Sequence, residues 1–312
     1  MRVSANGVDI EVEDSAAAQP GTDGGSAPPV VLLIMGLGMQ LIAWPAQLVQ
    51  ALVDAGYRVL RCDNRDAGLS QRFDGLGKPN LWWQGLRYQF GLAPSAPYSV
   101  ADMAADAMGV LDAVGIARAH VVGASMGGMI AQRMALAAPQ RLTSLTSLMS
   151  SSGARGLPRP QPQVLRVLLT GPRDSSLQAI EDHYVKLFGV IGSPAFATPQ
   201  AQLRAQVRQG VERGYYRIGT LRQMLAIMAD VSRAAQLAQI TVPTLVLHGK
   251  ADPLVPYAHA VDTARRIAGA QLVGIEGMGH DLAAGVVERL LPPLLSHLQA
   301  ADARRSTAPT TV

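Results

Sequence analysis

The chain has 312 residues, of which 48% are hydrophobic and 16% are charged. This composition excludes disorder along most of the chain, and the length suits one large α/β domain with an insertion, or two ordinary domains. The net charge of +4 comes from basic residues that stand singly or in pairs such as Arg265–Arg266. Scattered charges indicate a solvated, mildly basic surface, so we expect no nucleic-acid partner.

The single cysteine, Cys62, excludes an intramolecular disulfide and lies at the end of an apolar run, which predicts a core residue rather than a reactive thiol. The first residues lack the hydrophobic stretch of a secretory signal. The longest apolar runs, such as 30–35, are far shorter than a membrane span. We therefore expect a cytoplasmic protein, a monomer or a homodimer, that acts without a membrane partner.

The predicted strands begin with two short alternating segments, 2–5 and 8–13, around Asn6-Gly7, a dipeptide that favours a tight hairpin. Residues 15–29 are rich in Ala, Gly and Pro and predict a loose loop. Continuous apolar runs with the length of buried strands then occur at 30–34, 57–61, 120–122, 142–149, 244–247 and 270–275. Runs of this kind predict a sheet that is covered on both faces.

Helical patterns lie between these runs at 43–55, 99–114 and 126–138. Ser99 precedes the second pattern as an N-cap, and Asp102 stands where it would complete a capping box. Strands that alternate with helices predict an α/β fold with a mostly parallel, doubly wound sheet. The N-terminal hairpin would form an antiparallel edge of this sheet.

The segment 152–239 interrupts the alternation of strands and helices. It opens with a Pro-rich linker at 157–162 and continues as several helices with Gln and Arg on their faces. We interpret it as a helical cap inserted into the α/β core, whose two parts are then 1–151 and 240–300. The small and polar residues of 301–312 predict a disordered tail.

Residues 123–128 read Gly-Ala-Ser-Met-Gly-Gly and fit the G-x-S-x-G pattern between a strand-like run and a helix. A serine at such a junction sits in a sharp turn, where the flanking glycines avoid the clash that a Cβ would make. The start of the helix directs unpaired N–H groups toward the same point. The pattern therefore predicts that Ser125 is a nucleophile at the edge of the sheet.

Four further motifs surround this turn in a fixed order: Met-Gly-Leu-Gly at 35–38, D-x-R-x-x-G-x-S at 63–70, Gly-Lys-Ala-Asp-Pro-Leu-Val-Pro at 249–256, and Gly-Met-Gly-His-Asp at 277–281. With this set the chain resembles the α/β-hydrolase fold superfamily of serine hydrolases, and within it the aclacinomycin methylesterase-like subset of bacterial esterases. Many members carry a histidine where this chain has Met35, so the loop would lack the hydrogen bonds of that histidine. We expect Arg65 to brace loops near the site.

The motif order suggests the partners of the serine. A serine hydroxyl needs a base to take its proton as it attacks, and His280 is the candidate base and later acid. Asp252, just after the strand at 244–247, is the candidate carboxylate that orients the imidazole. Asp281 and Glu276 are closer to the histidine in sequence, but an acid adjacent to its own histidine reaches the outer ring nitrogen with difficulty.

We expect the backbone N–H of Met126 to bind the oxyanion, and the resemblance implies the N–H of Leu37 as the second donor. The residues expected to line the substrate cleft are Gly36, Leu37, Met39, Met126, Met129 and Met278. Trp82 and Trp83 belong to an aromatic segment that borders the pocket in relatives. Packing of this segment beneath the cap is an equal alternative.

Flexible methionines and the lack of a placed charge favour neutral apolar esters of small to medium size. We therefore expect a carboxylic ester hydrolase that works with water through an acyl-enzyme on Ser125. The same three residues could instead serve C–C bond, lactone or amide hydrolysis, perhydrolysis or acyl transfer, and a non-catalytic ligand receptor is the alternative from another class. No metal-ligand spacing and no dinucleotide-binding fingerprint occurs, so we expect neither metal nor cofactor.

Overall fold

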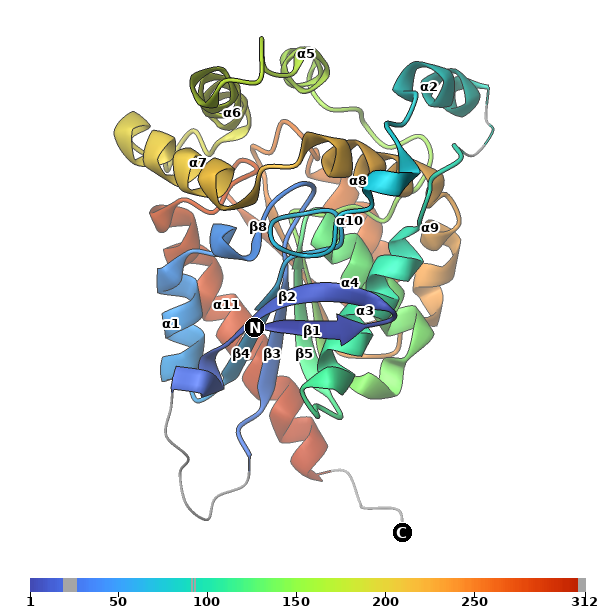
Figure 1. Cartoon of the computed structure of the whole chain (residues 1–312). Helices are drawn as coiled ribbons and strands as arrows, with labels where there is room; N and C mark the ends of the chain where they lie inside the picture. The colour runs from blue at the N-terminus through green and yellow to red at the C-terminus, as the bar shows by residue number, and fades with distance from the viewer. Residues whose placement is uncertain (19–26, 91, 93, 308–312) are drawn as a thin grey trace.

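The computed structural model describes residues 1–18, 27–90, 92 and 94–307. At its centre lies an eight-stranded sheet with the order β1-β2-β4-β3-β5-β6-β7-β8 (Figure 1). The strands are β1 (Arg2–Ala5), β2 (Val8–Asp14), β3 (Val30–Ile34), β4 (Arg58–Cys62), β5 (Ala119–Ala124), β6 (Leu142–Leu148), β7 (Thr244–Gly249) and β8 (Gln271–Ile275).

The six strands from β3 to β8 pair in parallel, and the N-terminal hairpin adds an antiparallel edge through β2 and β4. Asn6 and Gly7 have φ values of 53° and 72°, as a tight hairpin turn with two left-handed residues requires. The α/β class, the mostly parallel sheet and its antiparallel edge are therefore as the sequence predicts.

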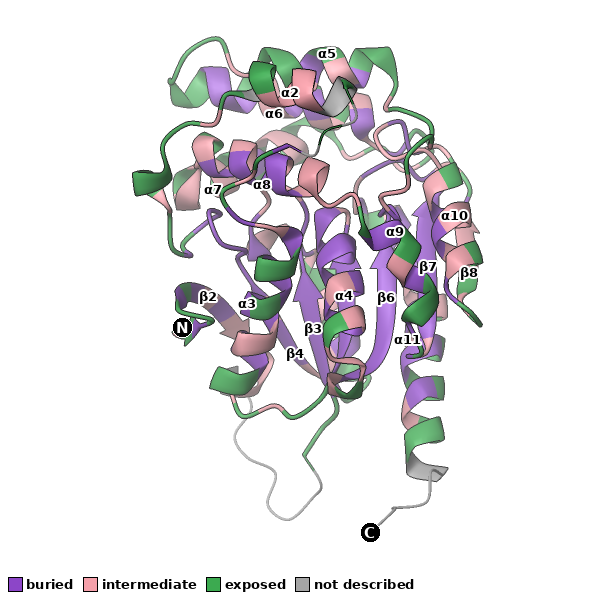
Figure 2. Ribbon diagram, turned by 90° about the vertical axis from the view of Figure 1, so that its right-hand side faces the viewer, coloured by how far each residue is buried: buried purple, intermediate pink, exposed green. Residues whose placement is uncertain are grey.

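Helices cover both faces of the sheet, because alternate residues of the apolar strands point to opposite sides. Leu32 and Ile34 pack with α3 and α4, whereas Val31 and Leu33 pack with α1 and α11. Figure 2 shows the buried strands between these helices. The helices of the core are α1 (Ala46–Asp54), α3 (Val100–Ala113), α4 (Met126–Ala137), α10 (Ala258–Arg266) and α11 (Ala284–Thr307).

The capping box expected at the start of α3 is present. The N–H of Asp102 donates to Oγ of Ser99 at 3.1 Å, and the N–H of Ser99 donates to Oδ2 of Asp102 at 2.7 Å. Short 3-10 helices occur at η1 (Ser15–Ala18), η2 (Leu41–Ala43), η3 (Asp74–Leu76), η4 (Pro139–Arg141) and η5 (Leu237–Gln239). Residues 19–26 of the expected loop lie outside the described part of the chain.

The segment between β6 and β7 is helical. It contains α5 (Pro162–Thr170), α6 (Leu177–Ile191), α7 (Gln200–Gly214), α8 (Arg217–Ala229) and α9 (Arg233–Gln236). Helices α5–α8 lie above one end of the sheet in Figure 1, and we call these four helices the cap. Helix α2 (Leu81–Gln89) reaches the same layer from an earlier part of the chain and packs against α8.

The C-terminal tail is more ordered than its composition predicts. Helix α11 continues to Thr307, and Ala301 is buried. Asp302 accepts a hydrogen bond from the Tyr57 hydroxyl at 3.1 Å and lies 3.1 Å from Nε2 of His120. The expectation of disorder is therefore wrong up to Thr307, because alanine favours helix and these contacts anchor the last turns to the core. The last five residues lie outside the described part of the chain.

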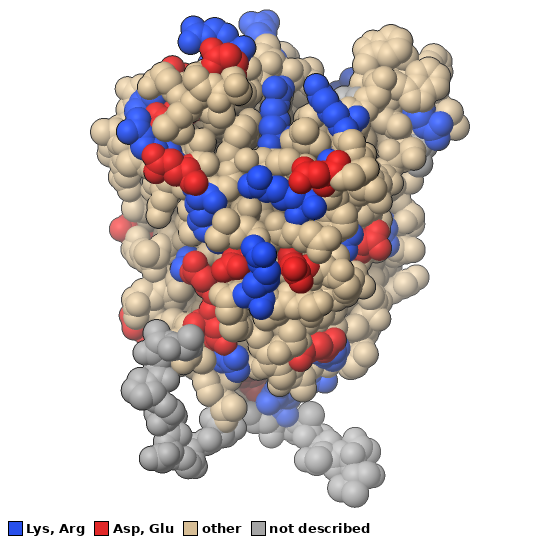
Figure 3. Space-filling view, in the orientation of Figure 1, with Lys and Arg blue, Asp and Glu red and all other residues tan. Residues whose placement is uncertain are grey.

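Charged side chains of both signs alternate over the face of the molecule shown in Figure 3. Ion pairs of the described residues include Arg58 with Asp14 and Arg61 with Glu13, each at 2.6 Å. The described residues of this face therefore form no extended basic patch. Within the residues that the structure describes, no helix has both the length and the apolar character that a bilayer crossing requires.

Candidate active site

Ser125 occupies a strained turn between β5 and α4. Its φ of 55° and ψ of −118° lie in a region that residues other than glycine rarely adopt. A Cβ on Gly123 would lie 2.1 Å from the carbonyl oxygen of Gly127, and a Cβ on Gly127 would lie 2.0 Å from that of Ile34. The two glycines thus permit a backbone approach that no other residue allows, and the sharp turn expected from the sequence is present.

A chain of hydrogen bonds joins the three residues predicted to react. Oγ of Ser125 lies 3.1 Å from Nε2 of His280, and Nδ1 of the same ring lies 2.7 Å from Oδ2 of Asp252. The other carboxylate oxygen accepts the N–H groups of Leu254 at 2.9 Å and Val255 at 2.8 Å. Ser125 follows β5, Asp252 follows β7 and His280 follows β8, so the parallel sheet brings all three to one edge.

The Asp252 carboxylate is buried, and burial alone would raise its pKa. The charge and hydrogen bond of His280, together with those of His248, outweigh burial and hold the pKa of Asp252 below its usual range. His248 lies in β7 with Nε2 at 3.4 Å from Oδ2 of Asp252 and 2.7 Å from the carbonyl oxygen of Val255. The carboxylate is therefore ionised at neutral pH and can stabilise a protonated imidazole.

The two other acids near the histidine in sequence have different partners. Asp281 accepts a hydrogen bond from the hydroxyl of Ser193, and burial raises the pKa of its carboxyl. Glu276 is exposed and pairs with Lys250. Of the three candidate acids, Asp252 is the one hydrogen-bonded to the histidine ring.

Two backbone N–H groups are available beside Ser125. Met126 is the first residue of α4, and Leu37 lies in the loop that follows β3. In the described part of the chain, neither N–H donates to a protein acceptor. A Cβ on Gly36 would lie 3.0 Å from Cβ of Ser125, so the backbone just before Leu37 lies against the serine. Unpaired N–H groups in this position suit a negatively charged oxygen.

The residues expected to line the cleft are found in different surroundings. Met129 is buried in the core cluster of α3 and α4. Met39 is half-buried against the core cluster of α1 and α11, in which Met278 is completely buried. Trp82 and Trp83 lie on α2 with 73% and 53% of their surface exposed. Packing of the tryptophans beneath the cap is therefore wrong, and their contact with substrate stays a prediction.

The loop that carries Arg65 is braced as expected. The guanidinium donates to both carboxylate oxygens of Asp106 at 2.6 Å, and it lies 5.4 Å and 5.2 Å from the ring centres of Phe73 and Tyr98. Both charges of this pair are buried. The loop after β4 is thereby fixed to α3.

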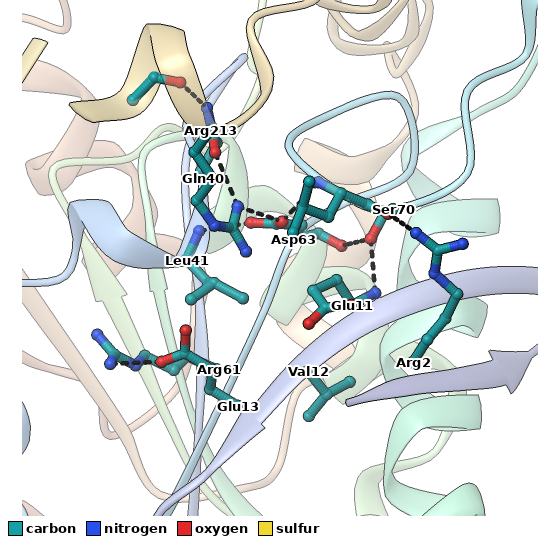
Figure 4. Close-up of polar contacts among 12 residues, drawn as sticks. Arg2, Glu11, Val12, Glu13, Gln40, Leu41, Arg61, Asp63, Ser70 and Arg213 are labelled. Carbon is teal, nitrogen blue, oxygen red and sulfur yellow. Dashed lines mark hydrogen bonds and ion pairs between the residues drawn. The ribbon is translucent and has the colours of Figure 1, made fainter. Parts of the chain in front are cut away.

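Sequence reasoning missed the cap residues that reach the same loop. Arg213 of α7 donates to Asp63 at 2.6 Å (Figure 4), and Arg222 of α8 donates to Asp66 at 2.9 Å. Gln223 of α8 donates to the carbonyl oxygen of Arg65 at 2.7 Å. These three cap residues belong to no recognisable motif, so the sequence carried no signal for them.

Among the residues that the structure describes, no group of three or more His, Cys, Asp or Glu is placed to hold a metal ion. The arrangement at Ser125 offers the groups that acyl transfer needs. It holds a hydroxyl beside an imidazole, an ionised carboxylate behind the imidazole, and two free N–H donors.

Comparison with known proteins identifies the family of this chain. Residues 29–283 match the family described as alpha/beta hydrolase fold. Rhodomycin D methylesterase DauP from Streptomyces sp. (strain C5) is 33% identical over 299 residues, which cover 89% of this chain and 93% of that protein. Rhodomycin D methylesterase DnrP from Streptomyces peucetius has the same identity and coverage.

Solved structures agree at the level of the fold. A meta-cleavage product hydrolase from Pseudomonas fluorescens IP01 superposes with a TM-score of 0.71 at 19% identity, covering 96% of this chain and 98% of that one. The enol-lactonase from Burkholderia xenovorans LB400 gives a TM-score of 0.66 at 21% identity, covering 97% and 98%. Because the family match spans most of the chain and two relatives reach 33% identity, the protein belongs to the α/β-hydrolase family.

Proposed function

We propose that the protein is a serine carboxylesterase, in which Ser125 attacks the carbonyl carbon of a carboxylic ester. The observation that carries this proposal is the chain of hydrogen bonds from Ser125 through His280 to Asp252 at a strained strand–helix turn. The two methylesterase relatives support ester hydrolysis as the reaction.

In the first half of the reaction, Nε2 of His280 takes the proton of the Ser125 hydroxyl as Oγ bonds to the carbonyl carbon. The carbonyl oxygen becomes negatively charged and is stabilised by the N–H groups of Met126 and Leu37. The imidazolium then gives its proton to the alkoxide oxygen as the C–O bond breaks, and an alcohol leaves. Asp252 keeps the proton on Nδ1 and stabilises the positive ring.

In the second half, water attacks the acyl-enzyme. His280 takes a proton from the water, the same two N–H groups stabilise the second oxyanion, and the proton returns to Oγ of Ser125 as the carboxylic acid leaves. The side chains supply the nucleophile, the base and the acid, so we propose that the reaction needs water and no metal or organic cofactor. A rate that is unchanged by EDTA would agree with this.

We propose esters with small to medium apolar acyl or alcohol groups as the substrate class. Met126 and Met129, which follow Ser125 in α4, are buried and apolar, which suits neutral groups rather than charged ones. The relatives are named for the methyl ester of rhodomycin D, so methyl esters are the first alcohol group to examine. We propose a cytoplasmic monomer or homodimer as the acting form.

The test is hydrolysis of p-nitrophenyl acetate, butyrate, octanoate and palmitate, and of methyl butyrate, by the wild type and by Ser125→Ala. We expect a maximum at short or medium chains and a loss of at least about 10⁴-fold in kcat for the variant. Circular dichroism and the Tm of both proteins establish that the variant is folded.

Absence of turnover on every ester, by a folded wild-type protein, would contradict the proposal and favour a specialised acyl substrate or a ligand receptor. Turnover that Ser125→Ala retains would contradict the assignment of the nucleophile.

A further inference from the structure

Gln223 on cap helix α8 is completely buried, and its side-chain amide joins two loops of the core. Its Oε1 accepts the N–H of Gly38 at 2.8 Å, and its Nε2 donates to the carbonyl oxygen of Arg65 at 2.7 Å. A buried amide that is bonded at both ends holds its partners firmly, because a broken bond would leave a buried polar group without a partner. The position of Gly38 is therefore set from the cap.

Gly38 belongs to the tight turn that contains Leu37, the expected oxyanion donor. The turn is closed by a hydrogen bond of 3.1 Å from the N–H of Met39 to the carbonyl oxygen of Gly36. Gly38 has a φ of 66°, as the third residue of a type II turn requires. A Cβ on Gly38 would lie 2.6 Å from Oγ1 of Thr220, so this turn lies directly against α8.

The segment after the turn is also held by the cap. Arg213 of α7 donates to Oε1 of Gln40 at 2.7 Å and to Oδ2 of Asp63 at 2.6 Å, and Oδ1 of Asp63 accepts the N–H of Leu41 at 2.7 Å. Figure 4 shows this guanidinium between Gln40 and Asp63. Cap side chains thus hold the loop at two points just after Leu37, at Gly38 and at Gln40.

We propose that Gln223 is a positioning residue, which acts through Gly38 to hold the N–H of Leu37 where the oxyanion forms. A donor stabilises the transition state only if it is held in place before the reaction, and a displacement of about 1 Å loses much of its effect. Gln223 supplies a hydrogen bond from the cap to the turn that carries Leu37. This inference rests on the proposed function.

The test compares two variants that exchange a completely buried glutamine for methionine. Gln223→Met removes both contacts of the amide at nearly constant volume. Gln132→Met is the matched control, because Gln132 is equally buried on α4 and donates to Ser147 at 3.2 Å, away from the turn at Leu37. For each protein, kcat and KM are measured with p-nitrophenyl butyrate, and the inhibition constant with 1-butaneboronic acid. The boronic acid forms a tetrahedral adduct on a serine that resembles the oxyanion intermediate.

For Gln223→Met we expect kcat to fall by about 10- to 100-fold, less than the 10²- to 10³-fold cost of losing a whole oxyanion donor. The affinity for the boronic acid should fall in parallel, while KM changes by less than about threefold, because the contact matters most in the transition state. The control should retain both kcat and the boronic acid affinity. The proposal is overturned if Gln223→Met keeps the kcat of the wild type, if its loss appears only in KM, or if both variants lose kcat equally.

A second variant, Gln223→Glu, gives a test that does not depend on the folding of Gln223→Met. When protonated, the introduced carboxyl can accept from Gly38 and donate to the Arg65 carbonyl as the amide does. When ionised, it loses the donor and places a negative charge near the oxyanion. We expect the ratio of variant to wild-type kcat to be near one at low pH and to fall as the carboxyl ionises. A ratio that is low at every pH would contradict the proposal.

Failure of this inference is distinct from failure of the proposed function. If the wild type hydrolyses esters and Ser125→Ala does not, the protein is a serine hydrolase. If the Gln223 variants then have the kcat of the wild type, only the positioning role of Gln223 is disproved.

Discussion

Arg222 of the cap and Asp66 of the core form an ion pair with a separation of 2.9 Å, and 1% and 0% of their side chains are exposed. The guanidinium also donates to the carbonyl oxygen of Gly77 at 2.9 Å, and the carboxylate accepts from the hydroxyl of Tyr98 at 2.9 Å. Two buried charges of this kind depend on each other, because either alone would lack compensation. A buried ion pair therefore joins the cap to the core.

Breaking this pair should destabilise the whole fold. We expect Asp66→Asn to lower the free energy of unfolding by about 3–5 kcal/mol, because the guanidinium stays buried without its counter-charge. Asn suits the φ of 63° at this position, so the effect reports the lost charge rather than backbone strain. Urea unfolding followed by circular dichroism measures it.

Asp174→Asn is the control for Asp66→Asn, since the Arg173–Asp174 pair is exposed. Its effect on the free energy of unfolding should lie within the error of the measurement. Equal effects for the two variants would mean that the buried pair contributes no more than a surface pair.

The identity of the acid can be decided by two matched substitutions. We expect Asp252→Asn to lower kcat by about 10³- to 10⁴-fold, because the amide cannot stabilise the imidazolium and favours the wrong tautomer. Asp281→Asn should lower kcat by less than about 10-fold, since its side chain contacts Ser193 rather than the ring. The measurement is kcat for p-nitrophenyl butyrate at neutral pH. A larger loss for Asp281→Asn would reverse the assignment.

The close approach of backbone at the serine turn predicts opposite effects for two Gly→Ala substitutions. Gly123→Ala places a Cβ 2.1 Å from a backbone oxygen and should lower the free energy of unfolding by at least about 2 kcal/mol. Gly189→Ala lies in α6, where nothing stands within 4 Å of the new Cβ, and should raise it by about 0.5–1 kcal/mol. Thermal or urea unfolding measures both effects. If Gly123→Ala leaves the free energy of unfolding unchanged, the turn can relax to accommodate the Cβ.

His297 on α11 should give the stability a particular dependence on pH. Burial and the neighbouring charge of His120 lower the pKa of His297 to about 4, compared with about 6.5 in an unfolded chain. Between these values the unfolded chain binds a proton that the folded protein does not. The free energy of unfolding should therefore decrease by about 3 kcal/mol as the pH falls from about 6.5 to 4, and this group should add no further change below that.

The substitution His297→Leu isolates this contribution. Leucine does not titrate, so the variant lacks this dependence of stability on pH. The free energy of unfolding of the variant, relative to that of the wild type, should therefore increase as the pH falls from about 6.5 to 4. Urea unfolding at a series of pH values gives the two curves. Parallel curves over this range would show that the imidazole titrates alike in both states.

Much of the fold and of the candidate site followed from local patterns in the sequence. Apolar runs broken by helical periods predict a covered parallel sheet, and the carboxyl ends of parallel strands meet at one edge. Motif residues that each follow a strand must therefore converge, and Ser125, His280 and Asp252 do so. The turn at Ser125 was predictable because glycine spacing reports a close backbone approach within a few residues.

Other features could be decided only by the tertiary structure. Gly38 and Gln223 are 185 positions apart, and a glutamine on a cap helix has no signature that distinguishes a solvated side chain from a buried link. The exposure of Trp82 depends on where α2 packs, and the order of α11 up to Thr307 depends on contacts with Tyr57 and the core. Sequence by itself determined the local turns, the strands and helices in chain order, and the candidate reactive side chains. Tertiary packing decided which distant polar groups pair, because burial and hydrogen bonding between distant segments arise only when the chain has folded.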